Sequence, residues 1–396
     1  MTLKAIDDAI TPLQRARLEL GWKQPRVIAE LISLAQQLGI RVARPASLKT
    51  MLSRWENGLG QPDAVYRRLF RTIYQADDDQ LGFTHRFSDT TMSVAPAFGI
   101  ETVAYFRNVL DQHIQADHLM GPHHLVEVVR AQATLLDQVL RDARTEIRPQ
   151  LMTLACRYNE VTGWLYQDAG DGVSAMQYSD RAMDYALALD DPIDTAYLLM
   201  RKSNIACDLG SPDRALGLTE AALRESTKVP PRIRVLILTQ QARAHAQRRD
   251  ANACATSLDA AMRQVTHNEA DADDVARYCT PGYVGMQAAT CWTELRSPDR
   301  AIPVFERALA TWPAIQRRDQ GLCLARLALA YALNGDRASA CRIGVRAVET
   351  VGSATSARAM HDLRRLRERL APWRRDAEEL NLNLKIKNLV QGAPHR

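Results

Sequence analysis

The sequence predicts an all-α protein in two parts, a small basic helical module followed by a long array of helix pairs. Apolar residues recur at helical spacing along most of the 396 residues, whereas aromatic residues make up only 6% of them. Beyond residue 149, small residues recur with a period near 40 residues, as expected for helix pairs that stack on one another.

Positive charge is concentrated in the first part. Residues 12–74 contain 11 Lys or Arg and four Asp or Glu, a net charge of +7, whereas the whole chain carries +5. A compact basic module on a nearly neutral body is the electrostatic pattern of a protein that binds a polyanion.

The rest of the composition is ordinary for a water-soluble protein, with 46% hydrophobic and 24% charged residues. No apolar run approaches the ~18–20 residues that span a membrane, and the N-terminus lacks the apolar core of a signal peptide. We therefore expect a cytoplasmic protein. The seven Cys include no C-x-x-C pair and are expected to be reduced core thiols, the alternative being a redox-sensing cysteine.

The segment 47–62 is the most informative part of the module. A helix there would bury one apolar face, formed by Leu48, Met51, Leu52 and Trp55. The opposite face would carry hydrogen-bonding side chains, those of Lys49, Thr50, Ser53 and Arg54. Ser47 is a suitable N-cap, and Asn57-Gly58 is a suitable stop. A short helix with such a face suits the DNA major groove, the alternative being an ordinary surface helix.

Three more helices complete the module. They are predicted over residues 12–20, with Thr11 as N-cap, 24–38 and 63–76. A basic loop with Arg41 and Arg44 precedes the polar helix. Four short helices with a polar third helix predict a helix-turn-helix domain over residues 1–86.

Two motifs, L-x-x-G-W-x-Q (18–24) and S-R-W-E-N-G (53–58), resemble the phage-repressor type of helix-turn-helix, the XRE family. The resemblance implies contacts with double-stranded DNA. Bases would be read by Lys49, Thr50, Ser53 and Arg54. The DNA backbone would be contacted by Gln24, Arg26 and Asn57.

The chain departs from this family in the interval between Gln24 and Trp55. At 31 residues it is longer than the family's, so the second helix and its loop must be extended. Arg41 and Arg44 lie in the added stretch. They are candidates for further contacts with the DNA backbone, the alternative being a solvated loop.

Five sets of residues share one pattern after residue 149. Each has a small residue, a turn residue seven positions later, and further residues, most of them small, 12 and 19 positions after the first. The sets begin at Gly163, Ser203, Ala242, Ala289 and Ala328. Their turn positions are Gly170, Gly210, Arg249, Arg296 and Gly335.

This pattern resembles tetratricopeptide (TPR) helix pairs and predicts a TPR-like α-solenoid over residues 101–356. A degenerate first pair is expected at about 101–146, with repeats from about 149. Residues 87–100 would be a linker, and 357–396 a basic C-terminal capping helix and tail.

A solenoid of this kind presents a concave groove. The resemblance implies that the first helix of each pair lines it, here with Arg157, Glu160, Trp164, Asp168, Tyr197, Asn204, Asp208 and Arg243. Such side chains suit a peptide or small-molecule effector. The alternative is that the groove packs against the N-terminal module or another subunit.

Motifs for enzymatic chemistry are absent from the sequence. There is no P-loop, dinucleotide-binding, zinc-protease or serine-hydrolase motif, so we expect neither enzymatic activity nor a cofactor. The histidines between His113 and His124 lack metal-ligand spacing, so a solvent-exposed turn is expected there and no metal site. The arginine run 364–369 is expected to be a solvated terminal helix.

Three further segments, 117–122, 163–171 and 201–204, resemble a group of actinobacterial regulators that join an XRE domain to TPR repeats. The resemblance implies a sequence-specific transcriptional regulator that binds DNA as a homodimer at the nucleoid. The alternative is a scaffold or adaptor that binds peptide partners. The sequence leaves open the target DNA, the effector, and whether transcription is activated or repressed.

Overall fold

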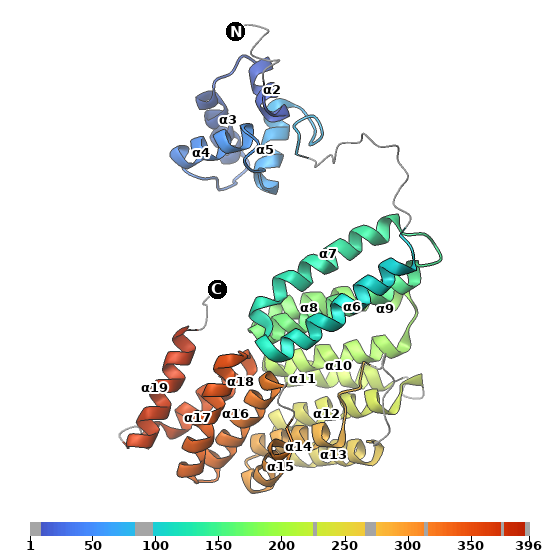
Figure 1. The fold of residues 1–396 in the computed structure, drawn as a ribbon, viewed down its shortest axis with the longest axis vertical. Coiled ribbons are helices and arrows are strands. Elements are labelled where there is room, and N and C mark those ends of the chain that lie inside the picture. The colour runs from blue at the N-terminus through green and yellow to red at the C-terminus, as the bar shows by residue number, and fades with distance from the viewer. Residues whose placement is uncertain are drawn as a thin grey trace. The chain divides into compact units, whose positions relative to one another are not determined.

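The computed structural model describes residues 9–83, 98–224, 228–265, 275–312, 316–373 and 376–392. Every regular element in these residues is a helix (Figure 1), which confirms the all-α prediction for them. The chain divides into two compact units, Met1–Val94 and Ala95–Arg396. None of the helices in the described ranges combines the length and hydropathy that a membrane-spanning segment needs.

Four helices make up the described part of the N-terminal unit: α2 (Pro12–Glu19), α3 (Gln24–Gln37), α4 (Pro45–Glu56) and α5 (Ala64–Tyr74). The apolar stripe predicted for α4 is largely buried, and its Trp55 is only 8% exposed. The Trp55 ring centroid lies 5.1 Å from that of Tyr66 and 5.8 Å from that of Phe70. This aromatic packing holds one face of α4 against α5, so the opposite face is turned to solvent.

The helix boundaries in this unit follow from local sequence. Thr11 caps α2 as predicted, because its side chain accepts a hydrogen bond from the first turn. The prediction of Ser47 as N-cap of α4 is wrong, since the helix begins at Pro45, whose ring fixes φ for the first turn. Asn57 ends α4 and Gly58 has a φ of +71°, as predicted. The long interval before α4 is occupied by α3 and a connection over residues 38–44.

A buried ion pair joins α2 to the end of α4. Arg17 Nε and Nη2 donate to Glu56 Oε1 and Oε2 at 2.6 and 2.9 Å. Arg17 is 9% exposed and Glu56 only 1%. Gln24 Nε2, at the start of α3, donates to the same carboxylate at 2.9 Å. Glu56 therefore holds three helices together.

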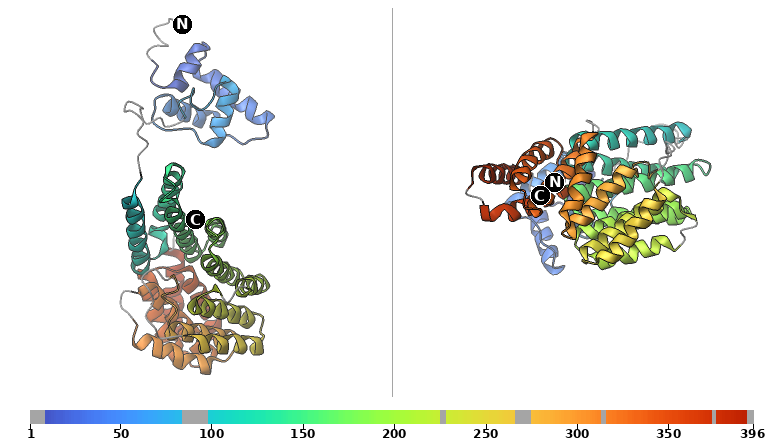
Figure 2. Two further views of the ribbon diagram at one scale, coloured as in Figure 1. Left: turned by 90° about the vertical axis from the view of Figure 1, so that its right-hand side faces the viewer. Right: turned by 90° about the horizontal axis from the view of Figure 1, so that it is seen from below.

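Seven helix pairs make up the described part of the second unit (Figures 1 and 2). They are α6 (Ile100–Met120) with α7 (Val126–Asp142), α8 (Arg148–Ala169) with α9 (Gly172–Ala188), α10 (Pro192–Asp208) with α11 (Pro212–Leu223), α12 (Pro231–Gln247) with α13 (Ala251–Gln264), α14 (Pro281–Glu294) with α15 (Pro298–Ala310), α16 (Arg317–Leu333) with α17 (Arg337–Ser353), and α18 (Ala357–Leu370) with α19 (Ala377–Gly392). The array resembles a tetratricopeptide solenoid, and α6 and α7 occupy the predicted degenerate first pair.

The repeated small residues lie where the two helices of a pair meet. A Cβ added to Gly163 would come within 3.0 Å of the Ala175 carbonyl oxygen on the partner helix. In the next pair, Ser203 is fully buried and its hydroxyl donates to the Ala215 carbonyl oxygen at 3.1 Å. Close approach of the two backbones therefore explains why these positions are small.

The five turn positions all have left-handed backbone conformations. The φ angles are +94° at Gly170, +69° at Gly210, +63° at Arg249, +62° at Arg296 and +84° at Gly335. Glycine adopts this conformation without strain, whereas arginine does not. Two of the five turns therefore contain an unfavourable residue.

Replacing Arg249 by glycine should stabilise the protein by ~0.5–1 kcal/mol, because relief of the left-handed strain exceeds the entropy that glycine gains on unfolding. The control is Arg248→Gly at the preceding position, where φ is −76° and glycine should destabilise by a similar amount. Urea unfolding of both variants measures the effect. Equal destabilisation by the two substitutions would contradict the expectation.

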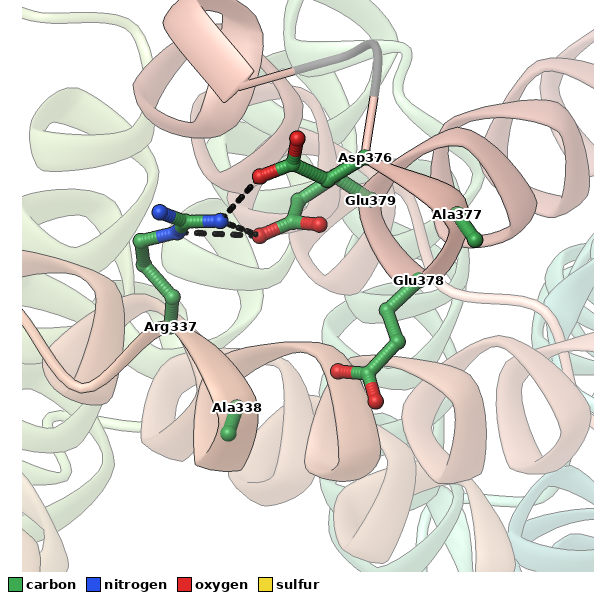
Figure 3. A pocket seen from close by; sticks show the side chains of 6 residues that line it. All are labelled: Arg337, Ala338, Asp376, Ala377, Glu378 and Glu379. Carbon is green, nitrogen blue, oxygen red and sulfur yellow. Dashed lines mark hydrogen bonds and ion pairs between the residues drawn. The ribbon is translucent and has the colours of Figure 1, made fainter.

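Helices from the two ends of the second unit contact each other. Helix α18 packs against α8 as well as α16, and α6 also contacts α16. The predicted solvated terminal helix is in fact amphipathic: Leu363 and Leu366 of α18 are fully buried, while Arg364 is exposed. At the start of α17, Arg337 contacts Asp376 and donates to Glu379, which ties α19 to α17 (Figure 3).

Candidate ligand cavity and nucleic-acid interface

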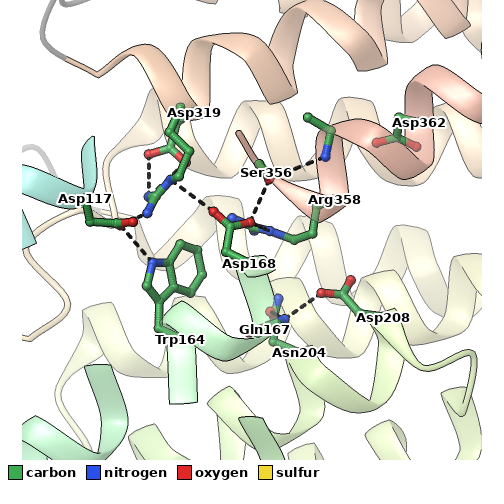
Figure 4. Close-up of polar contacts among 12 residues, drawn as sticks. Asp117, Trp164, Gln167, Asp168, Asn204, Asp208, Asp319, Ser356, Arg358 and Asp362 are labelled. Atoms are coloured by element: carbon green, nitrogen blue, oxygen red, sulfur yellow. Dashed lines mark hydrogen bonds and ion pairs between the residues drawn. The ribbon is translucent and has the colours of Figure 1, made fainter. Parts of the chain in front are cut away.

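A buried polar cluster joins the two ends of the second unit (Figure 4). We call it the closure cluster, and it comprises Asp117 of α6, Trp164 and Asp168 of α8, Arg318 and Asp319 of α16, Ser356, and Arg358 of α18. Ser356 Oγ donates to Asp168 Oδ1 at 2.6 Å although the two residues are 188 positions apart. The cluster therefore links segments that the repeat pattern alone does not bring together.

Asp168 lies at the centre of the cluster and is fully buried. Arg358 Nε donates to its Oδ1 at 3.0 Å, and Arg318 Nε lies 3.4 Å from its Oδ2. Burial raises the pKa of Asp168, and Arg358 only partly offsets this. The ionised carboxylate therefore depends on its two arginine neighbours.

Trp164 occupies the space between these charged groups. Its Nε1 donates to Asp117 Oδ2 at 3.1 Å. The guanidinium carbons of Arg201, Arg318 and Arg358 lie 4.7, 4.7 and 4.4 Å from its ring centroid. Cation–π contacts with an indole compensate in part for the burial of these arginines.

A second set of polar side chains runs from α8 to α12. Gln167 Nε2 donates to Asn204 Oδ1 at 2.6 Å and to Asp208 Oδ2 at 2.5 Å. Asn204 Nδ2 in turn donates to Gln240 Oε1 at 2.9 Å, and Arg201 Nη2 donates to Gln167 Oε1 at 3.1 Å. These contacts fix the side chains along one edge of a cavity.

The cavity has a volume of about 300 Å³ and lies among the first helices of successive pairs, α8, α10, α12, α14 and α16, together with α18. Its charged lining consists of Asp208, Arg243, Glu294, Arg326, Arg358, His361, Asp362, Arg364 and Arg365. Burial would raise the pKa of Asp208, but Arg243 and Arg358 lower it overall. The cavity is therefore polar and rich in guanidinium groups.

Two of the predicted groove residues, Asp208 and Arg243, line this cavity and contact each other. Asn204 does not line the cavity, but its Oδ1 accepts a hydrogen bond from Gln167, which does. The other predicted groove residues lie elsewhere. Trp164 and Asp168 belong to the closure cluster, while Arg157, Glu160 and Tyr197 are held in contacts of their own, Arg157 with Asp194 and Tyr197, and Glu160 with Arg201.

Four arginines of the cavity wall were not predicted from the sequence: Arg326, Arg358, Arg364 and Arg365. Arg358 and Arg365 are seven positions apart and so lie on one face of α18, which is the only sequence signal of a shared role. A second hollow of about 370 Å³ lies between the starts of α17 and α19 (Figure 3). Among the described residues that line it, the cationic side chain is Arg337, which already contacts two carboxylates there.

The N-terminal unit presents the residues predicted to read DNA on the outer face of α4. Lys49, Thr50 and Arg54 are exposed and Ser53 is half-buried. Asn57 Nδ2 donates to the Ser53 carbonyl oxygen at 2.7 Å. The surface is therefore open to a partner molecule.

Most of the predicted backbone contacts are also exposed, namely Arg26, Arg41, Arg44 and Asn57. Arg26 lies over the Trp22 ring, 4.7 Å from its centroid. Gln24 differs, because it is half-buried and its amide donates to Glu56. Its side-chain amide therefore donates a hydrogen bond inside the unit and is not turned to solvent as a DNA-backbone contact would be.

Other expected features concern cysteines and metals. All seven Cys are buried. In the described ranges no three His, Cys, Asp or Glu side chains are grouped so that they could hold a metal ion. His118 lies in α6, with Nδ1 3.7 Å from Asp319 Oδ2, so it borders the closure cluster instead of forming part of an exposed turn.

No family model matches the chain, and no curated protein matches it. Among solved structures it is similar to a Rap protein complexed with competence and sporulation factor, with 13% identity, a TM-score of 0.49 and coverage of 96% of this chain and 99% of that one. It is also similar to the apo form of the quorum sensor NprR from B. thuringiensis (11% identity, TM-score 0.40, coverage 92% and 97%). A third similar structure is BtubC from P. vanneervenii (20% identity, TM-score 0.40, coverage 56% and 90%).

Proposed function

We propose that this chain is a regulator with two binding units. The polar cavity of the repeat unit receives a peptide or small-molecule ligand, and the N-terminal unit binds double-stranded DNA in a sequence-specific manner. Two copies of the chain, acting as a homodimer, read two half-sites about one helical turn apart or a multiple of it. Ligand binding changes the arrangement of the two N-terminal units and thereby the affinity for DNA.

One observation carries the DNA-binding part of the proposal. Helix α4 is anchored by the buried Trp55 on one side and carries Lys49, Thr50 and Arg54 exposed on the other. Side chains of these types donate hydrogen bonds to base edges in the major groove. The net charge of +7 over residues 12–74 adds attraction to phosphates that does not depend on sequence.

A second candidate function is that of an adaptor that binds peptide partners and has no sequence-specific contact with DNA. The observation that favours it is the inward position of Gln24, whose amide is hydrogen-bonded to Glu56 and not presented to solvent as a phosphate contact requires. The cavity serves equally well in both functions. Binding-site selection from random double-stranded DNA with the purified full chain separates them, because an adaptor would enrich no sequence.

Replacing Arg54 by alanine should relax specificity at one base position of the selected site and cost ~1–3 kcal/mol of specific affinity. The matched control is Arg41→Ala, which removes one exposed positive charge at a predicted contact with the DNA backbone in the same unit. It should weaken binding to all sequences alike and lower the salt dependence by about one unit. Identical selected sites for Arg54→Ala and the wild type would show that α4 does not read bases.

A further inference from the structure

We infer that the cavity of the repeat unit binds a small oxyanion, a carboxylate or phosphate group, through its arginine side chains. This inference rests on the proposed function, because it names the ligand class of the cavity proposed there. It is drawn from the balance of charge and of hydrogen-bond donors in the cavity wall.

The cavity wall contains more guanidinium groups than carboxylates. Among the described residues, five arginines line it, at positions 243, 326, 358, 364 and 365, against three acids, at 208, 294 and 362. Each acid is already engaged by arginine: Asp208 by Arg243, Glu294 by Arg365, and Asp362 by Arg326 and Arg365. A ligand that enters therefore meets carboxylates that are neutralised, and the arginines still outnumber the acids when Asp168, the partner of Arg358 outside the cavity, is counted.

The same arginines retain unused donors. A guanidinium has five N–H groups, and each pair described above uses only some of them. Arg358 is the clearest case, because its Nε donates to Asp168 while its Nη2 is buried with no hydrogen-bond partner among the described residues. Buried polar atoms are normally hydrogen-bonded. A small rotation of this buried group toward the cavity would let an oxyanion there accept its hydrogen bond.

The position of Arg358 links such a ligand to the closure cluster. The side chain lines the cavity and also contacts Asp168 and the Trp164 ring. An oxyanion bound to it would hold α18 in the orientation in which Nε reaches Asp168. Ligand binding is therefore expected to stabilise the contact between the two ends of the repeat unit.

Isothermal titration of the full chain with citrate and with inorganic phosphate, at constant ionic strength, tests this inference. We expect saturable binding of at least one of them, weakened at least about tenfold by Arg358→Gln because a charge-assisted hydrogen bond is lost. Arg364→Gln at the exposed rim leaves the closure cluster intact and should weaken binding in the same direction. The control Arg346→Gln removes an exposed charge from α17, outside the cavity, and should bind as the wild type does.

Acetyl-trialanine, as free acid and as amide, distinguishes a peptide carboxylate from a free anion. Tighter binding of the acid than of the amide would extend the inference to peptide C-termini. Equal binding of the two would show that the cavity binds a ligand but does not select an oxyanion. No saturable binding of citrate, phosphate or the peptide acid would overturn the inference as well, as would binding that Arg358→Gln and Arg364→Gln leave unchanged. The DNA-binding part is measured separately with the same preparation, so its failure would be recognised independently.

Discussion

Replacing Arg318 by methionine should lower the free energy of unfolding of the repeat unit by ~3–5 kcal/mol, because removal of one partner from a buried ion pair leaves the other uncompensated. Arg318 is 3% exposed and contacts Asp117, Asp168 and Asp319. The closure cluster has three carboxylates and two guanidinium groups, so loss of Arg318 leaves a marked excess of negative charge. Urea unfolding followed by far-UV circular dichroism measures the effect.

The matched control is Arg130→Met, which removes a surface arginine 2.5 Å from Glu127 with both side chains nearly half exposed. That pair should contribute only ~0–1 kcal/mol. The double variant Arg318→Met, Asp168→Asn should recover part of the loss, because it removes one unneutralised carboxylate. A loss for Arg318→Met no larger than that for Arg130→Met would show that the closure cluster does not hold the ends together.

The loss of unfolding free energy caused by Arg318→Met should also depend on pH. Burial already raises the pKa of Asp168 in the wild type, and loss of a neighbouring guanidinium raises it further. A group whose pKa is raised on folding loses stability as pH rises through the folded pKa. The difference between variant and wild type should therefore grow as pH rises above about 4, the ordinary pKa of an aspartate.

The sequence was sufficient to predict features that depend on neighbouring residues. The positions of the repeats follow from local contacts. Ala242 must be small because two helices touch there, and the chain must turn seven positions later, at Arg249. The apolar stripe of α4 was readable for the same reason. The prediction of Ser47 as N-cap was wrong because two signals competed, and Pro45 starts the helix earlier than the serine would.

The closure cluster and the cavity could not be predicted in this way. Asp168 and Ser356 are 188 positions apart, and their contact depends on the small rotations accumulated over successive helix pairs. The repeat pattern predicts an open groove at Trp164 and Asp168, whereas Arg358 of α18 packs over them. The arginines of α18 resembled a solvated terminal helix because nothing in their spacing shows which distant helix they face.

A substitution in the N-terminal unit has an expected effect of similar size. Glu56→Gln should destabilise that unit by ~3–5 kcal/mol, because Arg17 would remain buried opposite a neutral amide. The two compact units need not unfold together, and most of the described helices belong to the repeat unit, so a far-UV unfolding curve reports that unit and is not a suitable measurement for the N-terminal one. Hydrogen exchange resolved by peptide is suitable, and protection should fall in residues 12–83 while residues 100–392 keep theirs.

The control for this substitution is Glu30→Gln, which makes the same chemical change at an exposed site, where Glu30 lies 3.9 Å from Arg26. It should change protection by no more than ~0.5 kcal/mol. Because Glu56 also orients the end of α4, Glu56→Gln should abolish selective DNA binding and leave citrate binding by the repeat unit unchanged. The variant could lose protection in the N-terminal unit and still select the same DNA sequence. That result would mean that DNA binding restores the fold, and that Glu56 stabilises only the free protein.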